Sequence, residues 1–332
     1  MSKIDIVITW VNGSDPLHLK KRQKYQNADS KHHAQATAST RFGHCGEIYY
    51  CIASILKYAN FINRIWIVTD NQRPAHLDAF AKAGLCDPDF IQVVDHKIVF
   101  RDFEEFLPTF NARSVEAVLW RIPELAEQFV YMNDDFFLNS NIASADFFDR
   151  GKPRIFGRFI KPDHRRLKIK IQDAFRKLTF QQENTRPSYR KALERASNLA
   201  GFTEKYLNTD HHPHPQRKSV LEEFFAENFS VLKKQVSYRF RSIDQYSPAS
   251  LGYHLEIARH GAKVENRLHL EYIRPNKIRI ADSAFDGIRN GTHKYGCIQS
   301  LDECDDEMIE YVQYLMSRKF HDYLPNQIDL MA

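Results

Sequence analysis

The first half of the chain alternates short apolar runs with segments in which apolar residues recur every three or four positions. The runs at residues 4–11, 64–69, 90–94 and 129–132 are rich in Ile, Val, Phe and Tyr, which predicts strands buried on both faces. Residues 47–59 and 112–120 have helical spacing, and Pro74 marks a further helix start. This alternation indicates an α/β fold with a mostly parallel sheet, Rossmann-like or GT-A-like, and helices on both faces.

The second half of the chain has a different pattern. Residues 150–177 contain eleven basic residues against two acidic ones, while residues 220–232, 248–260 and 305–316 have helical spacing. We therefore expect three parts. They are an α/β half at 1–149, a basic and mostly helical insertion at 150–205, and a second part of the same functional domain at 206–332.

Acids and amides follow three of the four predicted strands, as Asn12 with Asp15, Asp70 with Asn71, and Asn133 with Asp134 and Asp135. Ligands of such sheets bind beyond the carboxyl ends of the strands. Asp134 and Asp135 lie between apolar flanks, where each unpaired charge would cost several kcal/mol. A Mg²⁺ or Mn²⁺ ion that bridges a diphosphate would relieve this cost. The alternative is a solvated turn, or a helix N-cap at Asp135.

The first predicted strand ends in a turn that contains a glycine, a common way to bring backbone N–H groups near a nucleotide. Trp10, Asn12 and Gly13, together with Asn133, are the candidate nucleotide-binding residues. The turn has neither the Gly-x-Gly-x-x-Gly motif nor the lysine of a P-loop, which excludes those two modes of binding. Asp15 either contacts a ligand or caps the next helix.

Two further motifs carry candidate chemistry. In the sequence His211-His212-Pro213-His214, the proline disfavours chelation of a metal by neighbouring histidines. A single histidine that acts as a general base or a phosphate ligand, at the start of a helix near Gln216, fits better than zinc binding; surface histidines are the alternative. Residues 238–242 alternate arginine and aromatic side chains, which predicts either a strand that presents Arg241 to a phosphate or an ordinary edge strand.

The net charge of +5 and the pI of about 8.8 favour phosphate-bearing partners. Nucleic-acid binding is not expected, because the chain has neither a helix-turn-helix pattern nor clearly interleaved aromatic and basic residues. Five cysteines without zinc or Cys-x-x-Cys spacing indicate a reducing compartment. The amino terminus is not a signal peptide, and no apolar run approaches the ~20 residues of a membrane span. We expect a cytoplasmic protein whose membrane contact, if any, is peripheral at the inner face.

Together these segments resemble the Stealth family of sugar-1-phosphate transferases of bacterial capsules, whose animal relatives are the GlcNAc-1-phosphotransferases of lysosomal enzymes. Four blocks carry the resemblance in the family's order, at residues 4–16, 41–139, 211–242 and 297–302. The last block departs from the family, because Gln299-Ser300 stands where Asn-Asp is usual. Whether Asp302 joins the metal site instead is left open.

The resemblance implies transfer of a sugar 1-phosphate, with GlcNAc as the expected sugar, from a UDP-sugar to a hydroxyl of a glycan or phosphoglycan, with release of UMP. It makes 1–149 the nucleotide-sugar and metal-binding half. In this scheme Asp134 and Asp135 hold the metal, Arg241 binds the transferred phosphate, His211 takes the proton of the acceptor or contacts the phosphate, and Asp15 lies near donor or acceptor. The alternatives are a conventional metal-dependent glycosyltransferase that releases UDP and, more distantly, a basic nucleic-acid- or membrane-binding protein.

Overall fold

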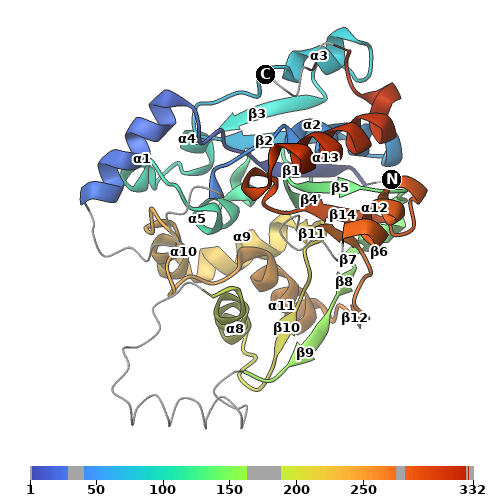
Figure 1. Cartoon of the computed structure of the whole chain (residues 1–332). Helices are drawn as coiled ribbons and strands as arrows, with labels where there is room; N and C mark the ends of the chain where they lie inside the picture. The colour runs from blue at the N-terminus through green and yellow to red at the C-terminus, as the bar shows by residue number, and fades with distance from the viewer. Residues whose placement is uncertain (1, 29–40, 163–187, 274–280, 327, 329–332) are drawn as a thin grey trace, which may run out of the picture.

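A computed structural model describes residues 2–28, 41–162, 188–273, 281–326 and 328, and its centre is a five-stranded sheet (Figure 1). The strand order is β11-β4-β1-β2-β3. The four strands β1 (Ile4–Thr9), β2 (Arg64–Thr69), β3 (Ile91–Asp95) and β4 (Gln128–Asn133) are parallel, and β11 (His214–Arg217) runs antiparallel to β4. The predicted α/β fold with a mostly parallel sheet is therefore confirmed.

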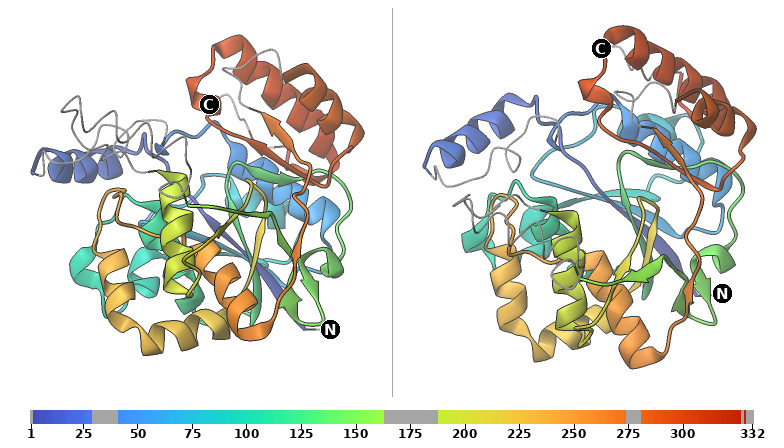
Figure 2. Two further views of the ribbon diagram at one scale, coloured as in Figure 1. Left: turned by 90° about the horizontal axis from the view of Figure 1, so that it is seen from below. Right: turned by 60° about the horizontal axis from the view of Figure 1, so that its bottom comes forward.

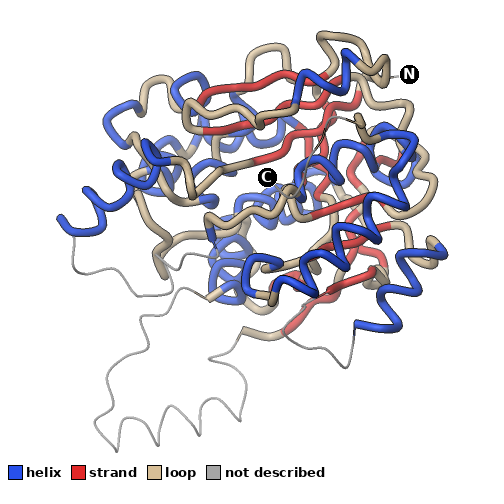
Figure 3. Tube along the Cα trace, turned by 45° about the horizontal axis from the view of Figure 1, so that its top comes forward, coloured by secondary structure: helices blue, strands red, loops and turns tan. Residues whose placement is uncertain are grey.

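Helices cover both faces of this sheet, as the views in Figures 2 and 3 show. Side chains alternate along β1, so that Ile4, Ile6 and Ile8 pack towards α2 (Glu47–Tyr58) and α13 (Asp306–Phe320). Val7 faces the opposite layer, which contains the helices α5 (Ala112–Glu116), α9 (Lys218–Glu227), α10 (Phe229–Val236) and α11 (Pro248–His260). Because both faces are covered, a continuous apolar run in the sequence becomes a buried strand.

Asp5 is the one charged residue within β1, and it is buried. Its carboxylate accepts hydrogen bonds from Trp66 Nε1 at 2.9 Å, Asn63 Nδ2 at 2.7 Å and the backbone N–H of Ala126 at 2.9 Å. Three donors satisfy a buried carboxylate well, so Asp5 links β1, β2 and the approach to β4 as a structural acid.

A second sheet fixes the turn that carries the two predicted metal ligands. It has the order β13-β14-β5, with β13 at Glu271–Ile273, β14 at Tyr295–Ile298 and β5 at Phe136–Leu138. Strand β5 follows β4 after a two-residue turn, and the backbone N–H of Ile298 donates to the carbonyl of Asp135 at 3.0 Å. At Gly296 a Cβ would lie 2.1 Å from Cζ of Phe137, so only glycine permits this approach.

The expected helices at 248–260 and 305–316 are found as α11 and α13, while residues 220–232 divide at Asn228 into α9 and α10. The helix expected near Gln216 begins at Lys218 as α9, and residues 214–217 before it form the edge strand β11, which was not predicted. Pro213 and Pro215 are compatible with this strand, because an edge strand tolerates proline. The strand predicted at residues 238–242 is wrong, because these residues form a loop in which the side chains of Asn111 and Ser114 donate hydrogen bonds to the carbonyl of Tyr238.

The region from residue 148 to 208 contains short strands and one helix in its described parts. Residues 163–187, with most of the basic run predicted there, lie outside the described residues. No helix of the described residues has the length and apolar character needed to cross a membrane. The remaining elements are α1 (Pro16–Ala28), α3 (Leu77–Lys82), α4 (His96–Val99), α6 (Ser144–Phe147), β6 (Phe148–Asp149), β7 (Lys152–Pro153), β8 (Ile155–Phe156), β9 (Arg158–Ile160), α8 (Tyr189–Leu199), β10 (Tyr206–Asn208), β12 (Val264–Glu265) and α12 (Ala281–Asn290).

Candidate active site

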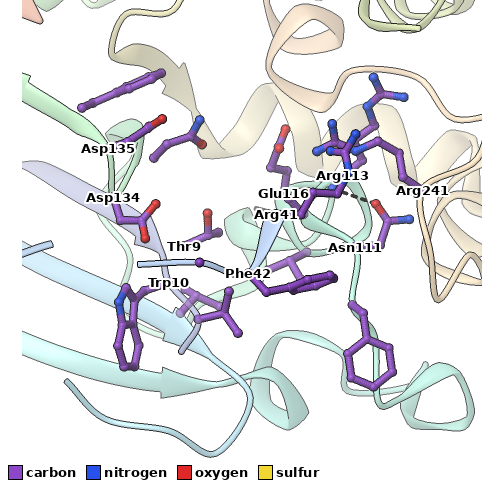
Figure 4. A pocket seen from close by; sticks show the side chains of 18 of the residues that line it. Thr9, Trp10, Arg41, Phe42, Asn111, Arg113, Glu116, Asp134, Asp135 and Arg241 are labelled. Carbon is purple, nitrogen blue, oxygen red and sulfur yellow. Dashed lines mark hydrogen bonds between the residues drawn. The ribbon is translucent and has the colours of Figure 1, made fainter. Parts of the chain in front are cut away.

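A cavity of about 600 Å³ lies at the carboxyl ends of β4, β1, β2 and β3. Its remaining walls come from the start of α5, from residues 41–43, from the loop that contains His211, and from residues 298–303. Figure 4 shows two groups of charged side chains on opposite sides of this cavity, an acidic group with Asp134 and Asp135 and a basic group with Arg41, Arg113 and Arg241.

The acidic group consists of Asp134, Asp135 and Glu47, all of which line the cavity and are only partly exposed. Burial, together with the neighbouring charges of Asp135 and Glu47, holds the pKa of Asp134 well above its usual range. Burial and the charge of Glu47 raise the pKa of Asp135 to about 7. Burial also raises the pKa of Glu47. Three carboxyl groups that repel one another in this way need a cation for all of them to ionise.

These residues fit a hard divalent cation. Oδ1 of Asp135 is buried without a hydrogen-bond partner in the described part of the chain, while its Oδ2 accepts a weak hydrogen bond from Cys297 Sγ at 3.7 Å. The described residues contain no group of three or more His, Cys, Asp and Glu side chains placed to hold a metal ion together. Mg²⁺ is usually held by one or two carboxylates, with substrate phosphates and water as the other ligands. Asp134 and Asp135 are therefore a suitable donor pair.

The basic group brings three guanidinium groups together with one carboxylate, that of Glu116. Burial, with the charge of Arg241, lowers the pKa of Arg113 to about 9 and that of Arg41 to about 10. Burial raises the pKa of Glu116, and the charges of Arg241 and Arg113 oppose this shift. Three cations beside one carboxylate leave an excess of positive charge, an environment that suits the negative charge of a phosphate group.

His211 lines the cavity. Its ring stacks on Tyr189, with the centroids 5.9 Å apart, and on Tyr272 at 5.4 Å. His214 is buried and also lines the cavity, with Nδ1 3.1 Å from the hydroxyl of Tyr253. His212 is buried, with Nδ1 2.7 Å from the carbonyl of Pro213, and its ring centroid lies 5.0 Å from that of His214. His211 and His214 are therefore the two histidines of this cluster that line the cavity.

The structure brings most of the predicted site residues to this one cavity. Trp10, Asn133, Asp134, Asp135, His211 and Arg241 all line it. Asn133 accepts a hydrogen bond from the hydroxyl of Tyr131 at 2.6 Å, which orients its amide.

Asn12, Gly13 and Asp15 are not among the lining residues and build the turn behind Trp10. Oδ1 of Asn12 accepts from the N–H of Ser14 at 2.9 Å, and Oδ1 of Asp15 accepts from the N–H of His18 at 2.7 Å, which caps α1. A Cβ at Gly13 would lie 2.3 Å from Cβ of Phe42, so a glycine lets Phe42 reach the cavity.

Several lining residues were not identified from the sequence, among them Arg41, Glu47, Arg113 and Glu116. Arg113 and Glu116 are three residues apart on α5, a spacing that places two side chains on one face of a helix. That signal was available but not specific. Arg41 precedes α2 and Glu47 is the first residue of that helix. Nothing in the local sequence indicates that either side chain reaches this cavity.

The fold and cavity define an α/β protein with a charged cavity at the carboxyl edge of a mostly parallel sheet. Residues 2–30 match the model of conserved region 1 of the Stealth proteins, and residues 41–155 match that of conserved region 2. The chain belongs to the Stealth family. These matches coincide with the first two blocks identified from the sequence, and the other two blocks stay predictions.

Curated relatives support this assignment. The capsular polysaccharide phosphotransferase cps1A of Actinobacillus pleuropneumoniae is 38% identical over 148 residues, which is 44% of this chain and 38% of the relative. The capsular polysaccharide phosphotransferase LcbA of Aeromonas hydrophila is 34% identical over 246 residues, 72% of this chain and 61% of the relative. The matched part thus spans less than two thirds of either relative. Among solved structures, mouse xyloside xylosyltransferase 1 aligns with a TM-score of 0.39 and 12% identity, covering 90% of this chain and 98% of that one.

Proposed function

We propose that this chain transfers a sugar 1-phosphate, with GlcNAc as the expected sugar, from a UDP-sugar to a hydroxyl of a glycan or phosphoglycan during capsule or exopolysaccharide synthesis. The observation that carries this proposal is the pair of opposed charged groups in one cavity. A diphosphate needs both a cation held by carboxylates and direct cationic contacts, and the two sides of the cavity offer one each. The names of the relatives favour the same class of reaction.

In the proposed reaction, an oxygen of the acceptor attacks the β-phosphorus of the donor. The new P–O bond joins the acceptor to the sugar phosphate, and the bond from the β-phosphorus to the bridging oxygen breaks, so that UMP leaves. Phosphoryl transfer of this kind depends on alignment and charge neutralisation more than on covalent chemistry by the protein. A Mg²⁺ or Mn²⁺ ion on Asp134 and Asp135 would supply charge neutralisation at the diphosphate and the departing UMP.

The chain's own side chains have separate tasks in this scheme. Arg241 binds non-bridging oxygens of the transferred phosphate, where the partial burial of its side chain makes its charge more effective than in water. His211 accepts the proton of the attacking hydroxyl, and its stacking on Tyr189 and Tyr272 fixes the plane of the imidazole ring. Trp10 and Asn133 line the same cavity, and in this scheme they contact the donor.

Identification of the released nucleotide tests this proposal. The full chain is incubated with Mg²⁺, a panel of UDP-sugars and glycan or phosphoglycan acceptors, and the nucleotides are separated by chromatography. We expect UMP and a new phosphodiester visible by ³¹P NMR, both absent with Asp134→Asn. Release of UDP in step with a new glycosidic bond would instead identify a conventional glycosyltransferase and overturn the proposal.

A further inference from the structure

The cavity extends beyond the proposed catalytic groups to the carboxyl ends of β2 and β3. There His18 from α1, Asp70 after β2 and His96 after β3 line its wall. Apolar side chains of Val11, Val68 and Phe110 line the same part. None of these residues has a task in the reaction described above, although three polar side chains and an apolar lining form a defined pocket.

The two imidazole rings have unmet hydrogen-bonding capacity. His18 is 3% exposed and His96 is 8% exposed, and Nδ1 of each is buried without a partner in the described residues. Burial lowers the pKa of both histidines, that of His96 to about 4, although the charge of Asp70 opposes the shift. Both rings are therefore neutral at pH 7, and each can present one N–H group to a ligand.

Asp70 completes this set as an acceptor. One of its carboxylate oxygens, Oδ2, lies 3.0 Å from Lys21 Nζ on α1. This contact with Lys21 holds the carboxylate in place, and the second oxygen can accept a hydrogen bond. His96 and His18 both interact electrostatically with Asp70, so the three groups share one end of the cavity as two donors and an acceptor.

The position of this pocket relative to Asp134 agrees with the shape of a nucleotide. Along the sheet order β4-β1-β2-β3, Asp134 follows β4 and Asp70 follows β2. Neighbouring strands are about 4.8 Å apart, so two to three spacings separate the pocket from the metal ligands by roughly 10–14 Å. In a nucleoside diphosphate, a ribose and the α-phosphate separate the base from the β-phosphate, and Thr9 at the end of β1 and Trp10 after it line the cavity wall.

We propose that His18, Asp70 and His96 form the nucleobase subsite and that they select uracil. The Watson–Crick edge of uracil presents an acceptor, a donor and an acceptor, as O2, N3–H and O4. Two imidazole N–H groups beside a carboxylate present the complementary set. N3 of cytosine carries no proton, so its lone pair would face a lone pair of the Asp70 carboxylate and no hydrogen bond could form between them. This inference deepens the proposed function and rests on it in taking the ligand to be a nucleotide.

Binding of UMP and CMP tests this inference without any turnover. Neither nucleotide carries a sugar to transfer, so calorimetric titration of the full chain in Mg²⁺ measures recognition alone. We expect UMP to bind at least ~10-fold more tightly than CMP, because a buried polar group left unpaired is strongly penalised. Asp70→Asn, whose amide can donate to N3 of cytosine, should cancel or invert that ratio. His96→Phe keeps a ring but removes the N–H group, and it should weaken UMP binding ~10-fold or more.

The matched control is Asp78→Asn, which removes an exposed carboxylate on α3 that pairs with Arg73 and does not line the cavity. It should leave the UMP-to-CMP ratio unchanged, and melting temperatures verify that every variant is folded. Equal affinity of the unmodified chain for UMP and CMP would overturn the inference, and so would an unaltered ratio in both Asp70→Asn and His96→Phe. A clear preference for UMP in a chain that releases only UDP would overturn the proposed reaction and leave the subsite intact.

Discussion

Among individual residues, Asp134 and Asp135 combine burial with nearby negative charge, and both effects raise the pKa of each carboxyl group. We predict that Asp135→Asn weakens Mn²⁺ binding by more than the roughly 10–100-fold that loss of an outer-shell partner costs. The reason is that the variant removes an anionic oxygen ligand while the size of the side chain is unchanged. Electron paramagnetic resonance of Mn²⁺ titrated into the protein measures the affinity directly.

The control for this variant is Asp149→Asn, because Asp149 is an exposed acid at the end of β6, outside the cavity. It should bind Mn²⁺ like the unmodified chain. In turnover assays, EDTA should abolish transfer and added Mg²⁺ should restore it. A full rate in EDTA would remove the metal from the scheme.

His211 is the second residue whose role can be measured alone. If it accepts the proton of the acceptor hydroxyl, His211→Ala should lower kcat by about 10²–10⁴-fold and change the KM of the donor much less. Steady-state kinetics with varied donor concentration separates the two parameters. An increase in KM at unchanged kcat would make His211 a binding residue instead.

What the sequence reveals at this scale depends on how local the signal is. Adjacent acids between apolar flanks single out Asp134 and Asp135 as candidates, since burial of an unpaired charge is costly. Arg113 and Glu116 belong to a segment that is recognisable as a helix, but only the packing of α5 beside β1 shows that they point into the cavity. Tertiary contacts of this kind leave no periodicity to detect.

Among the elements, α1 shows how a predicted site residue can have a structural task. Asp15 caps this helix through His18 N–H, so Asp15→Ala should lower the free energy of unfolding by about 0.5–2 kcal/mol. Asp15→Ser keeps a capping oxygen and should retain most of that stability. Chemical denaturation followed by circular dichroism provides the comparison. Loss of turnover in a stable Asp15→Ser variant would show that the carboxylate itself has a catalytic task.

Element boundaries were predicted well where one interaction dominates. The strand predicted at 64–69 coincides with β2, because a run of β-branched residues is a strong local signal for a strand. The helix predicted at 248–260 coincides with α11, because a proline at its first position and a glycine just after its last residue mark the two ends. The strand at 214–217 was missed for the opposite reason. A histidine- and proline-rich segment has no strand propensity, and it becomes β11 only because the edge of β4 is available to pair with it.

For the whole molecule, the carboxyl groups at the cavity couple stability to pH. Asp135 has an ordinary pKa of 3.8 and a pKa of about 7 in the fold, so between these values the folded chain holds a proton that the unfolded chain has released. The metal-free protein should therefore lose stability as the pH rises from 4 to 7. We expect the ionisation of Asp135 to lower Tm by a few degrees between pH 4 and pH 7, as measured by calorimetry in EDTA.

Two comparisons isolate the effect. Asp135→Asn cannot ionise, so its Tm should depend less on pH over the same range than that of the unmodified protein. Saturating Mg²⁺ should raise Tm most at pH 7 and above, where the carboxylates are free to bind it. An equal stabilisation by Mg²⁺ at pH 5 and pH 8 would contradict this account.

The overall architecture was predictable in part. Alternating strand-like and helix-like segments are sufficient to predict a parallel sheet with a layer of helices on each face, because the rules for crossover connections leave few other topologies. The antiparallel edge strand β11 and the second sheet β13-β14-β5 were not foreseen. Both depend on pairing between segments far apart in the sequence, whose short strands resemble loops when taken alone.

The hydrogen bond from Ile298 to Asp135 joins two residues that lie about half the length of the chain apart in the sequence. Such a contact closes a long loop, and long loops close late during folding. The nascent amino-terminal half can thus assemble its sheet during synthesis while the turn with Asp134 and Asp135 is still unclamped. Pulsed hydrogen exchange should show protection at Ile65 before Ile298, so that the capacity to bind metal would be among the last properties the chain acquires.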